Sequence, residues 1–355
     1  MTEAGGRLRQ VVEHWMPRIQ TAGITALDAE RLIAEAGDWP NWCATWVNEG
    51  ERQLELGAEA AALGRSLTAG EAYQRAALAF PFGQFMFFDD LAQKERAAAR
   101  RVEAYRRAAP NLLPPAEAVA ISFRGAALHG YLRRPAGTKA PLVAIVPGSD
   151  STKEEFGTLE EHFLKRGLAT LSVDGPGQGE GRSFGPLDPC DWPEALAAIA
   201  AAAKPEFGDR LGVMGMAFGG HLALQGAHAV PEIAAVVCMN GFYDLGSFWD
   251  ALPEIYRANM RYTLGGASLE DTRERARRFS LAGVPAPRCP VLVVHGGRDR
   301  IFPPADARRI AGFAGTQAQM VEYPDGNHVC NNLAYRYRPL IADWLAERLG
   351  GRVQP

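Results

Sequence analysis

The sequence lacks any long run of apolar residues. No stretch reaches the roughly 20 residues that a helix needs to cross a bilayer. The segment Met1–Arg9 is polar and contains glycine, so it has no apolar core of the kind that marks a secretory signal. These absences predict a cytoplasmic protein with no membrane partner.

Cysteine is also scarce, and its spacing excludes the usual structural roles. The five cysteines are odd in number, widely separated and form no Cys-x-x-Cys pair. They are Cys43, Cys190, Cys238, Cys289 and Cys330. We therefore expect reduced thiols, with neither a disulfide framework nor a metal site.

The glycine-rich segment Gly175–Gly181 lacks the features of a nucleotide loop. It follows a predicted strand, but it has no GxGxxG spacing and no Walker lysine. We interpret it as a tight structural loop, and no other motif predicts a cofactor.

Charge of one sign is not concentrated anywhere. The net charge is -3, and Lys, Arg, Asp and Glu are scattered along the chain, so there is no basic stripe for nucleic acid. Hydrophobic residues make up 47% and charged residues 22%, which is typical of a packed globular enzyme.

A length of 355 residues allows one large or two modest domains. A homodimer is left open.

The first part of the chain, residues 1–115, is predicted to be a helical N-terminal cap region. It is rich in Ala, Glu, Arg and Leu, and apolar residues such as Val12, Trp15 and Ile19 recur at helical spacing. A further helix is expected from Thr68 through Leu78, where Pro81 should interrupt it.

Residues 116–355 predict an α/β fold with a mostly parallel sheet. A hairpin is expected at residues 119–123 with its turn near Arg124 and Gly125, and short apolar runs then alternate with helical stretches. The runs are residues 141–146, 168–173, 210–214, 234–239 and 291–295. The stretch from about 242 to 288 has no such run, which indicates a helical, lid-type insertion.

The run at 210–214 leads into a glycine-rich turn and a helix, the setting of a nucleophile elbow. Gly215 and Gly219 supply the small residues that so sharp a turn needs. The middle position, where Ser, Cys or Asp normally attacks substrate, holds Ala217. Ala217 has no group that can attack.

An acid and a histidine follow the elbow in the chain order of α/β-hydrolases. Asp299 comes after the run at 291–295 and is the predicted orienting carboxylate, and His328 lies in the loop before a terminal helix and is the predicted base. Asp325 is the alternative acid, but its Pro-Asp-Gly setting predicts a turn residue.

Two backbone N–H groups should form an oxyanion hole. Phe218, directly after the elbow residue, supplies one, and Ser149, in the loop after the run at 141–146, supplies the other. Ser149 could also be a displaced nucleophile, but it lacks the elbow setting.

Aromatic residues gather in two places and suggest an apolar substrate pocket. Phe85 and Phe88 lie in the helical part, while Tyr243 and Trp249 lie in the insertion. We predict that these four bind an aromatic substrate. Packing between the two parts of the chain is the alternative, and Tyr131 and Tyr323 are further candidate hydrogen-bond donors.

Four motifs together resemble one family. They are Ser149–Glu155, Asp174–Glu180, Gly215–Gly220 and Asn240–Leu245. In them the chain is similar to the 2,6-dihydroxypseudooxynicotine hydrolase group of α/β-hydrolases, related to FrsA-like esterases and fungal polyketide-shortening hydrolases. The resemblance covers nearly the whole chain and implies an α/β-hydrolase fold, whose helical N-terminal region closes over the active site.

The resemblance implies hydrolysis of a carbon–carbon bond next to a ketone, in an aromatic or polyketide-like small molecule. Two features depart from it: the family's serine is Ala217, and the family's extra acidic residue has only Asp250 and Glu254 as candidates. The chain is therefore expected to be nearly inactive, as an inactivated Ser-to-Ala variant of an active hydrolase. The alternatives are an ester or thioester hydrolase and a naturally inactive ligand-binding pseudohydrolase.

Overall fold

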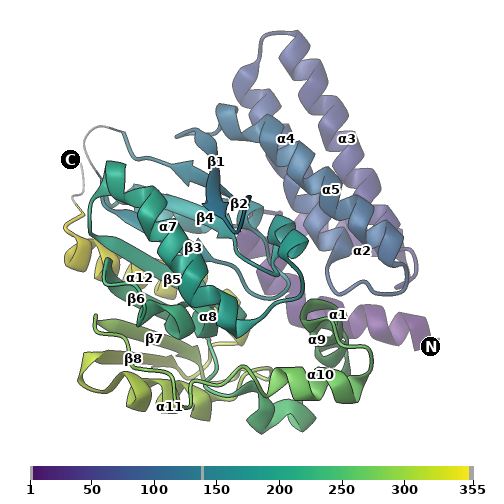
Figure 1. The fold of residues 1–355 in the computed structure, drawn as a ribbon. Helices are drawn as coiled ribbons and strands as arrows, with labels where there is room; N and C mark the ends of the chain where they lie inside the picture. Colours follow the sequence, from purple (N-terminus) through teal and green to yellow (C-terminus); the bar gives the residue numbers. More distant parts are fainter. Residues whose placement is uncertain (1–2, 137–139, 352–355) are drawn as a thin grey trace. The chain divides into compact units, whose positions relative to one another are not determined.

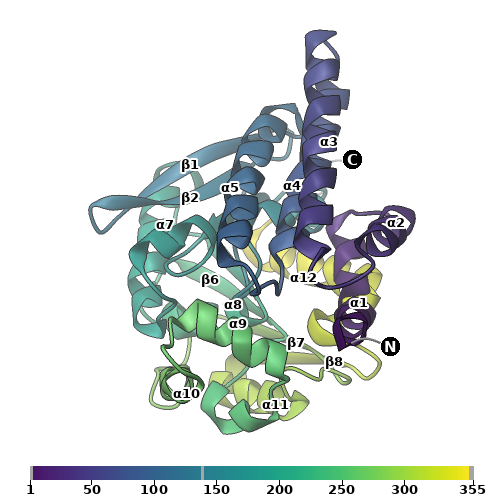
Figure 2. The ribbon, with the colours of Figure 1, turned by 90° about the vertical axis from the view of Figure 1, so that its right-hand side faces the viewer.

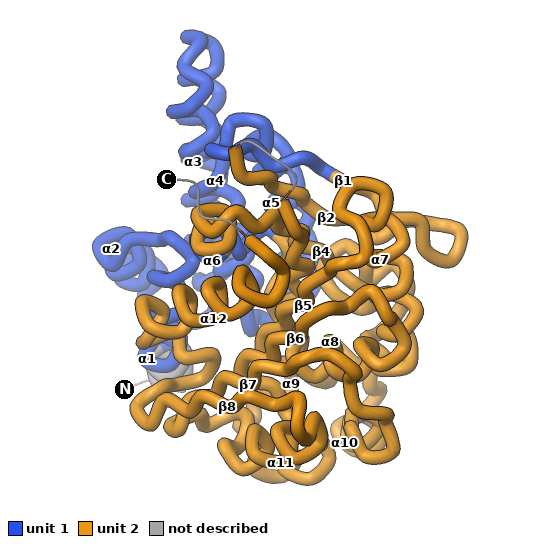
Figure 3. Tube along the Cα trace, turned by 90° about the vertical axis from the view of Figure 1, so that its left-hand side faces the viewer, with its two compact units in different colours: residues 1–118, 154–159 blue, residues 119–153, 160–355 orange. Residues whose placement is uncertain are grey.

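The computed structural model describes residues 3–136 and 140–351. The chain forms two compact units, which are described separately below (Figure 3). One comprises residues 1–118 with 154–159, and the other comprises residues 119–153 with 160–355. Residues 1–2 and 352–355, at the outer ends of the two predicted domains, lie outside the described residues.

The first unit is helical, as its composition predicts. Its helices are α1 (Glu3–Ala22), α2 (Ala26–Ala36), α3 (Trp42–Ala62), α4 (Ser66–Gln84) and α5 (Leu91–Ala108), followed by a 3-10 turn at Ala109–Asn111. Helices α3, α4 and α5 lie side by side (Figure 2). Tryptophans form much of the core between the helices: Trp39 stacks on Trp42 at 5.7 Å, and the Trp42 indole donates to the Phe82 carbonyl at 2.8 Å.

Helix α4 does not end before Pro81, and this part of the prediction is wrong. Pro81 lies inside a helix that continues to Gln84. Proline in a helix interior removes one hydrogen bond and costs about 3 kcal/mol. The neighbouring residues from Ala76 to Gln84 are all buried, so packing of this face outweighs the local cost.

A short segment from the middle of the chain belongs to the helical unit. Residues 154–159 join residues 1–118, whereas the sequence placed every residue after 115 in one domain. Glu154 forms a buried ion pair with Arg101 of α5 at 3.0 Å, and Glu155 pairs with Arg18 of α1 at 2.8 Å. These ion pairs tie the segment to two helices of the unit.

A mostly parallel sheet of eight strands runs in the order β1-β2-β4-β3-β5-β6-β7-β8. The strands are β1 (Ala116–Phe123), β2 (Ala126–Arg133), β3 (Leu142–Val146), β4 (Ala169–Asp174), β5 (Leu211–Met216), β6 (Ile233–Met239), β7 (Val291–Gly296) and β8 (Ala318–Tyr323). Strand β2 pairs antiparallel with β4, and the strands from β4 to β8 pair parallel to one another. The predicted strands and hairpin turn are confirmed, and β8 is an additional strand.

Helices cover both faces of the sheet. Helices α7 (Trp192–Phe207) and α8 (Phe218–Ala227) lie on one face, and α12 (Ala334–Leu349) lies on the other (Figure 1). Helix α11 (Pro304–Ala314) packs on β7 and β8, and α6 (Gly157–Leu164) precedes β4. Strands β3 and β7 are buried at every position, as their unbroken apolar sequences predict.

The predicted insertion is helical. It contains a 3-10 segment (Leu245–Ala251), α9 (Glu254–Leu264) and α10 (Leu269–Ala276), and its ends are joined by a β-bridge between Asp244 and Ser280. In the described ranges, no helix combines the length and the apolar character that crossing a membrane requires.

Candidate active site

The turn between β5 and α8 has the backbone of a nucleophile elbow. Ala217 has φ +50° and ψ -115°, a conformation that an L-residue adopts only at a cost of roughly 1–3 kcal/mol. Its N–H donates to the Met239 carbonyl at 2.8 Å, and its carbonyl accepts from the Gly220 N–H at 2.9 Å. These hydrogen bonds hold a partly exposed alanine at the N-terminus of α8.

Both glycines that flank the elbow are sterically required. A Cβ atom on Gly215 would lie 2.0 Å from the Gly219 carbonyl oxygen. A Cβ on Gly219 would lie 2.2 Å from the Val146 carbonyl oxygen at the end of β3. The strand and the helix can therefore approach this closely only because both side chains are absent.

The predicted acid and base lie together beyond the carboxyl ends of β7 and β8. His328 Nδ1 is 2.9 Å from Asp299 Oδ2, and both side chains are buried. Because a carboxylate only accepts hydrogen bonds, this contact assigns the proton of the neutral imidazole to Nδ1 and makes Nε2 the basic nitrogen. The alternative acid, Asp325, is exposed and pairs with Arg298 at 2.5 Å.

The Asp299 carboxylate is stabilised in its charged form. Burial by itself would raise its pKa, but the His328 imidazole and hydrogen bonds hold the pKa of Asp299 below its usual range. The Ile301 and Phe302 N–H groups donate to Oδ1 at 2.8 and 3.1 Å. Burial lowers the pKa of the adjacent His295, so His295 is neutral and leaves His328 as the partner of the carboxylate.

Asn240 is a site residue that the sequence analysis did not select. It directly follows β6 and has φ +48°. Its side chain is fully buried, and its Nδ2 donates to Asp299 Oδ2 at 2.8 Å. Its Oδ1 accepts from the Cys330 thiol at 3.7 Å. The sequence does not reveal the positive φ of Asn240. The available signal was its place as the first residue of the Asn240–Leu245 motif.

The two predicted oxyanion donors are adjacent to the elbow. Phe218 is the first residue of α8, so its N–H points out of the helix N-terminus. A Cβ on Gly148 would lie 3.7 Å from the Ala217 Cβ, which places the loop carrying Ser149 beside the elbow. Within residues 3–136 and 140–351, neither the Ser149 nor the Phe218 N–H has a hydrogen-bond acceptor.

The glycine-rich loop after β4 supports the oxyanion loop. Gln178, only 1% exposed, donates from Nε2 to the carbonyls of Pro147 and Gly148 at 2.5 and 3.1 Å. The buried Lys153 ammonium lies 2.8 Å from both Asp174 and Glu180. These carboxylates are of the kind that hold cations, and the Lys153 ammonium offsets one of their two negative charges.

The four predicted substrate-binding aromatics occupy different environments. In the helical unit, Phe85 packs edge-on against Trp15 at 4.8 Å, and Phe88 lies beneath the Lys94 ammonium. In the sheet unit, Trp249 is 4% exposed. The Arg309 guanidinium of α11 lies over the Tyr243 ring at 4.2 Å, so this ring packs against α11. Substrate contact by any of the four stays a prediction.

The candidates for an extra acidic residue are on the surface. Asp250 is exposed and pairs with Arg273 at 2.7 Å. Glu254 is exposed in the first turn of α9, where the helix dipole stabilises a negative charge. Both environments are those of surface and capping residues.

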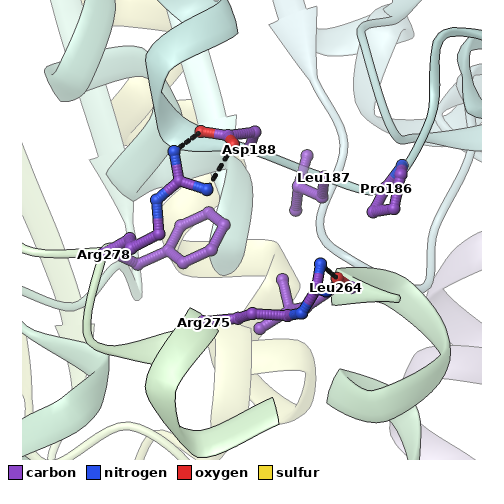
Figure 4. Close-up of a pocket in the computed structure, with 7 residues that line it drawn as sticks. Pro186, Leu187, Asp188, Leu264, Arg275 and Arg278 are labelled. Carbon is purple, nitrogen blue, oxygen red and sulfur yellow. Dashed lines mark hydrogen bonds and ion pairs between the residues drawn. The ribbon is translucent and has the colours of Figure 1, made fainter. Parts of the chain in front are cut away.

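A small cavity lies between the insertion and the loop that follows the glycine-rich segment (Figure 4). Its volume is about 100 Å³, and Arg275 and Arg278 are among its lining residues. Arg278 is paired with Asp188, and Arg275 donates to the Leu264 carbonyl. None of the predicted site residues lines this cavity.

Comparisons with known proteins place the chain in a family. Residues 142–338 match the model of the alpha/beta hydrolase family. The chain is 34% identical over 328 residues to 2,6-dihydropseudooxynicotine hydrolase from Paenarthrobacter nicotinovorans, covering 89% of this chain and 87% of that protein. It is 28% identical over 277 residues to esterase FrsA from Escherichia coli O157:H7, covering 74% and 66% respectively.

The fold agrees with the sequence comparison. A crystal structure of 2,6-dihydroxy-pseudo-oxynicotine hydrolase superposes with a TM-score of 0.86 at 31% identity, covering 96% of this chain and 98% of that one. The chain therefore belongs to the alpha/beta hydrolase family. Within that family, it is similar to 2,6-dihydroxy-pseudo-oxynicotine hydrolase, and the resemblance carried by its four motifs is confirmed.

Proposed function

We propose that the chain is a Ser-to-Ala form of a serine hydrolase that cleaves a carbon–carbon bond next to a ketone in an aromatic small molecule. The observation that carries the proposal is the Asp299–His328 contact at 2.9 Å together with an intact elbow around Ala217. The similarity to 2,6-dihydropseudooxynicotine hydrolase supports an aromatic ketone as substrate.

With serine at position 217, each part has a role. The hydroxyl attacks the ketone carbon while His328 Nε2 accepts its proton, and Asp299 holds the imidazole. The oxygen that becomes negative lies between the Ser149 and Phe218 N–H groups. The carbon–carbon bond then breaks, its electron pair leaves with the aromatic fragment, and His328 returns the proton to it. Water hydrolyses the acyl-enzyme.

The alanine removes the attacking atom but leaves the other parts in place. Loss of such a serine costs on the order of 10⁶ in turnover, which is about 8 kcal/mol of transition-state stabilisation. The acid–base pair, the strained elbow and the two unpaired N–H groups would have no common purpose without a nucleophile between them. Their joint presence supports an active hydrolase in which alanine replaces the serine. The alanine chain should therefore bind substrate without converting it.

The test is to restore the hydroxyl with Ala217→Ser. The variant is assayed against aryl ketones, including 2,6-dihydroxypseudooxynicotine, 1,3-diketones and aryl esters, beside the alanine chain and an Ala217→Ser/His328→Asn control. We expect turnover at least about 10³-fold above both controls on one ketone. If the alanine chain binds a ketone that the serine form leaves intact, the chain is a ligand-binding protein and the proposal is wrong.

An ester or thioester substrate is the second candidate. It is favoured by the 28% identity to esterase FrsA over 74% of this chain. The same residues would serve, with an alkoxide or thiolate as the leaving group. A burst of alcohol or thiol from the Ala217→Ser form, without turnover of any ketone in the panel, would select this candidate.

A further inference from the structure

Ser149 is held by the insertion as well as by its own loop. Asn259 of α9 donates from Nδ2 to Ser149 Oγ at 3.1 Å, and Thr263, one turn later, donates from Oγ1 to the Ser149 carbonyl at 3.4 Å. Asn259 is 3% exposed and Thr263 is fully buried. The insertion therefore reaches the loop that carries a predicted oxyanion donor.

The contact with Asn259 leaves the Ser149 hydroxyl with a proton to donate. A serine hydroxyl has one proton and can accept two hydrogen bonds. Here Oγ accepts from Asn259, and no described residue accepts the proton of Ser149 Oγ. A donor behind the oxygen polarises the hydroxyl and strengthens the hydrogen bond that it gives.

Helix α9 is firmly seated next to this loop. The Thr263 carbonyl accepts from the Leu187 N–H at 3.0 Å, and the Arg182 guanidinium lies over the Tyr262 ring at 3.9 Å. The part of α9 that follows Asn259 is thus fixed within the same unit. A fixed donor costs little reorganisation when charge develops on a substrate.

We propose that the Ser149 side chain is a third oxyanion donor, oriented and polarised by Asn259. This inference rests on the proposed function, because it takes the Ser149 N–H as one of the two backbone donors. The hydroxyl and the N–H of Ser149 both donate to the negative oxygen, and Phe218 donates from the other side. Asn259 is a positioning residue, and through it the insertion takes part in the chemistry.

The test measures how fast serine 217 is phosphonylated, which needs no knowledge of the substrate. In an Ala217→Ser background, a fluorophosphonate loses fluoride as the serine oxygen bonds to phosphorus and the serine proton passes to His328. The negative phosphoryl oxygen occupies the oxyanion hole. Second-order rate constants are read by intact-protein mass spectrometry for the added variants Ser149→Ala, Ser149→Thr and Asn259→Leu.

We expect Ser149→Ala to lower the rate by about 10²-fold, as loss of one oxyanion donor does. Ser149→Thr keeps a hydroxyl and should stay within about threefold, and Asn259→Leu should fall between the two. The matched control is Ser247→Ala, which removes an exposed hydroxyl from the same insertion and should change nothing.

The outcomes separate the two proposals. Equal rates for Ser149→Ala and its parent, or an equal loss in the Ala and Thr variants, would overturn the role of the hydroxyl. The absence of any labelling of Ala217→Ser would overturn it as well. Labelling that depends on Ser149, combined with no turnover of any ketone or ester, would uphold the oxyanion donor while refuting the proposed function.

Discussion

Replacing Asp299 with asparagine should destabilise the protein strongly. The carboxylate accepts two backbone N–H bonds on Oδ1, while Oδ2 accepts from Asn240 and faces His328 Nδ1. Asn has one accepting oxygen and one donating nitrogen, so in either orientation the new nitrogen faces donors. Two charge-assisted hydrogen bonds, each contributing about 1.5–3 kcal/mol, are lost inside a buried site.

We therefore expect Asp299→Asn to lower the free energy of unfolding by about 3–6 kcal/mol at pH 7, which is the sum of the two lost hydrogen bonds. Urea unfolding followed by circular dichroism measures it. Asp325→Asn is the matched control, because Asp325 is exposed and its pair with Arg298 should contribute less than about 1 kcal/mol.

The pH dependence gives a second readout of the same variant. The folded-state pKa of Asp299 is lowered, so its contribution to stability is complete above the unfolded-state pKa of about 4 and is lost as the pH falls through the folded value. The difference between parent and Asp299→Asn should shrink in acid. If Asp299→Asn loses less than about 1 kcal/mol at pH 7, as Asp325→Asn should, the hydrogen bonds assigned to the Asp299 carboxylate are wrong.

Three further predictions concern the frame of the site and the helical unit. Gly219→Ala should cost at least about 3 kcal/mol in urea unfolding, because its Cβ would lie 2.2 Å from a backbone oxygen; a loss under about 1 kcal/mol would contradict this close approach. Burial lowers the pKa of His221 to about 4, so the free energy of unfolding should fall by roughly 3 kcal/mol between pH 6.5 and pH 4. His221→Leu should flatten this dependence of stability on pH. An unchanged dependence would count against a neutral, buried imidazole. Arg101→Leu removes the buried ion pair with Glu154 and should lower the free energy of unfolding by about 3–5 kcal/mol. If the variant is as stable as the parent, this ion pair does not tie the 154–159 segment to the helical unit.

The parts of the site that are predictable from sequence are those that local chain chemistry defines. The elbow follows from glycines at positions 215 and 219 between an apolar strand and a helix, and its geometry is present. Asp299 and His328 follow from chain order, and their side chains meet at 2.9 Å. Parallel strands bring their carboxyl ends to one edge, so order along the chain becomes proximity in space.

The supporting residues could not be predicted, because their partners are far away in sequence. Asn259 contacts Ser149 across 110 residues, and Asn240 contacts Asp299 across 59. Buried amides of this kind follow no periodic pattern. Gln178 lies in the glycine-rich loop, and its hydrogen bonds to the oxyanion loop are set by tertiary packing.

Two features of the fold could not be predicted from the sequence, and the reason is the same. Pro81 is a strong local signal for the end of a helix, and burial of the surrounding residues overrides it. The membership of residues 154–159 in the helical unit rests on ion pairs with α1 and α5, which no local pattern reveals.

Residue 217 lies at the N-terminus of α8, and the proposed function requires that it face the His328 imidazole. A cysteine placed there reports on it directly, because a helix N-terminus and a protonated histidine both lower a thiol pKa. The variant is Ala217→Cys in a Cys190→Ser background, since Cys190 is the exposed native cysteine and the other four are buried.

Burial raises the pKa of Cys43, Cys238 and Cys330 to about 12 and that of Cys289 to about 11, so these thiols should not interfere. The measurement is the pH dependence of alkylation by iodoacetamide. We expect an apparent pKa for the new thiol at least about 2 units below the ordinary 8.5, and a higher pKa when His328→Asn is added. A value of about 8.5 or higher, unchanged by His328→Asn, would contradict this expectation.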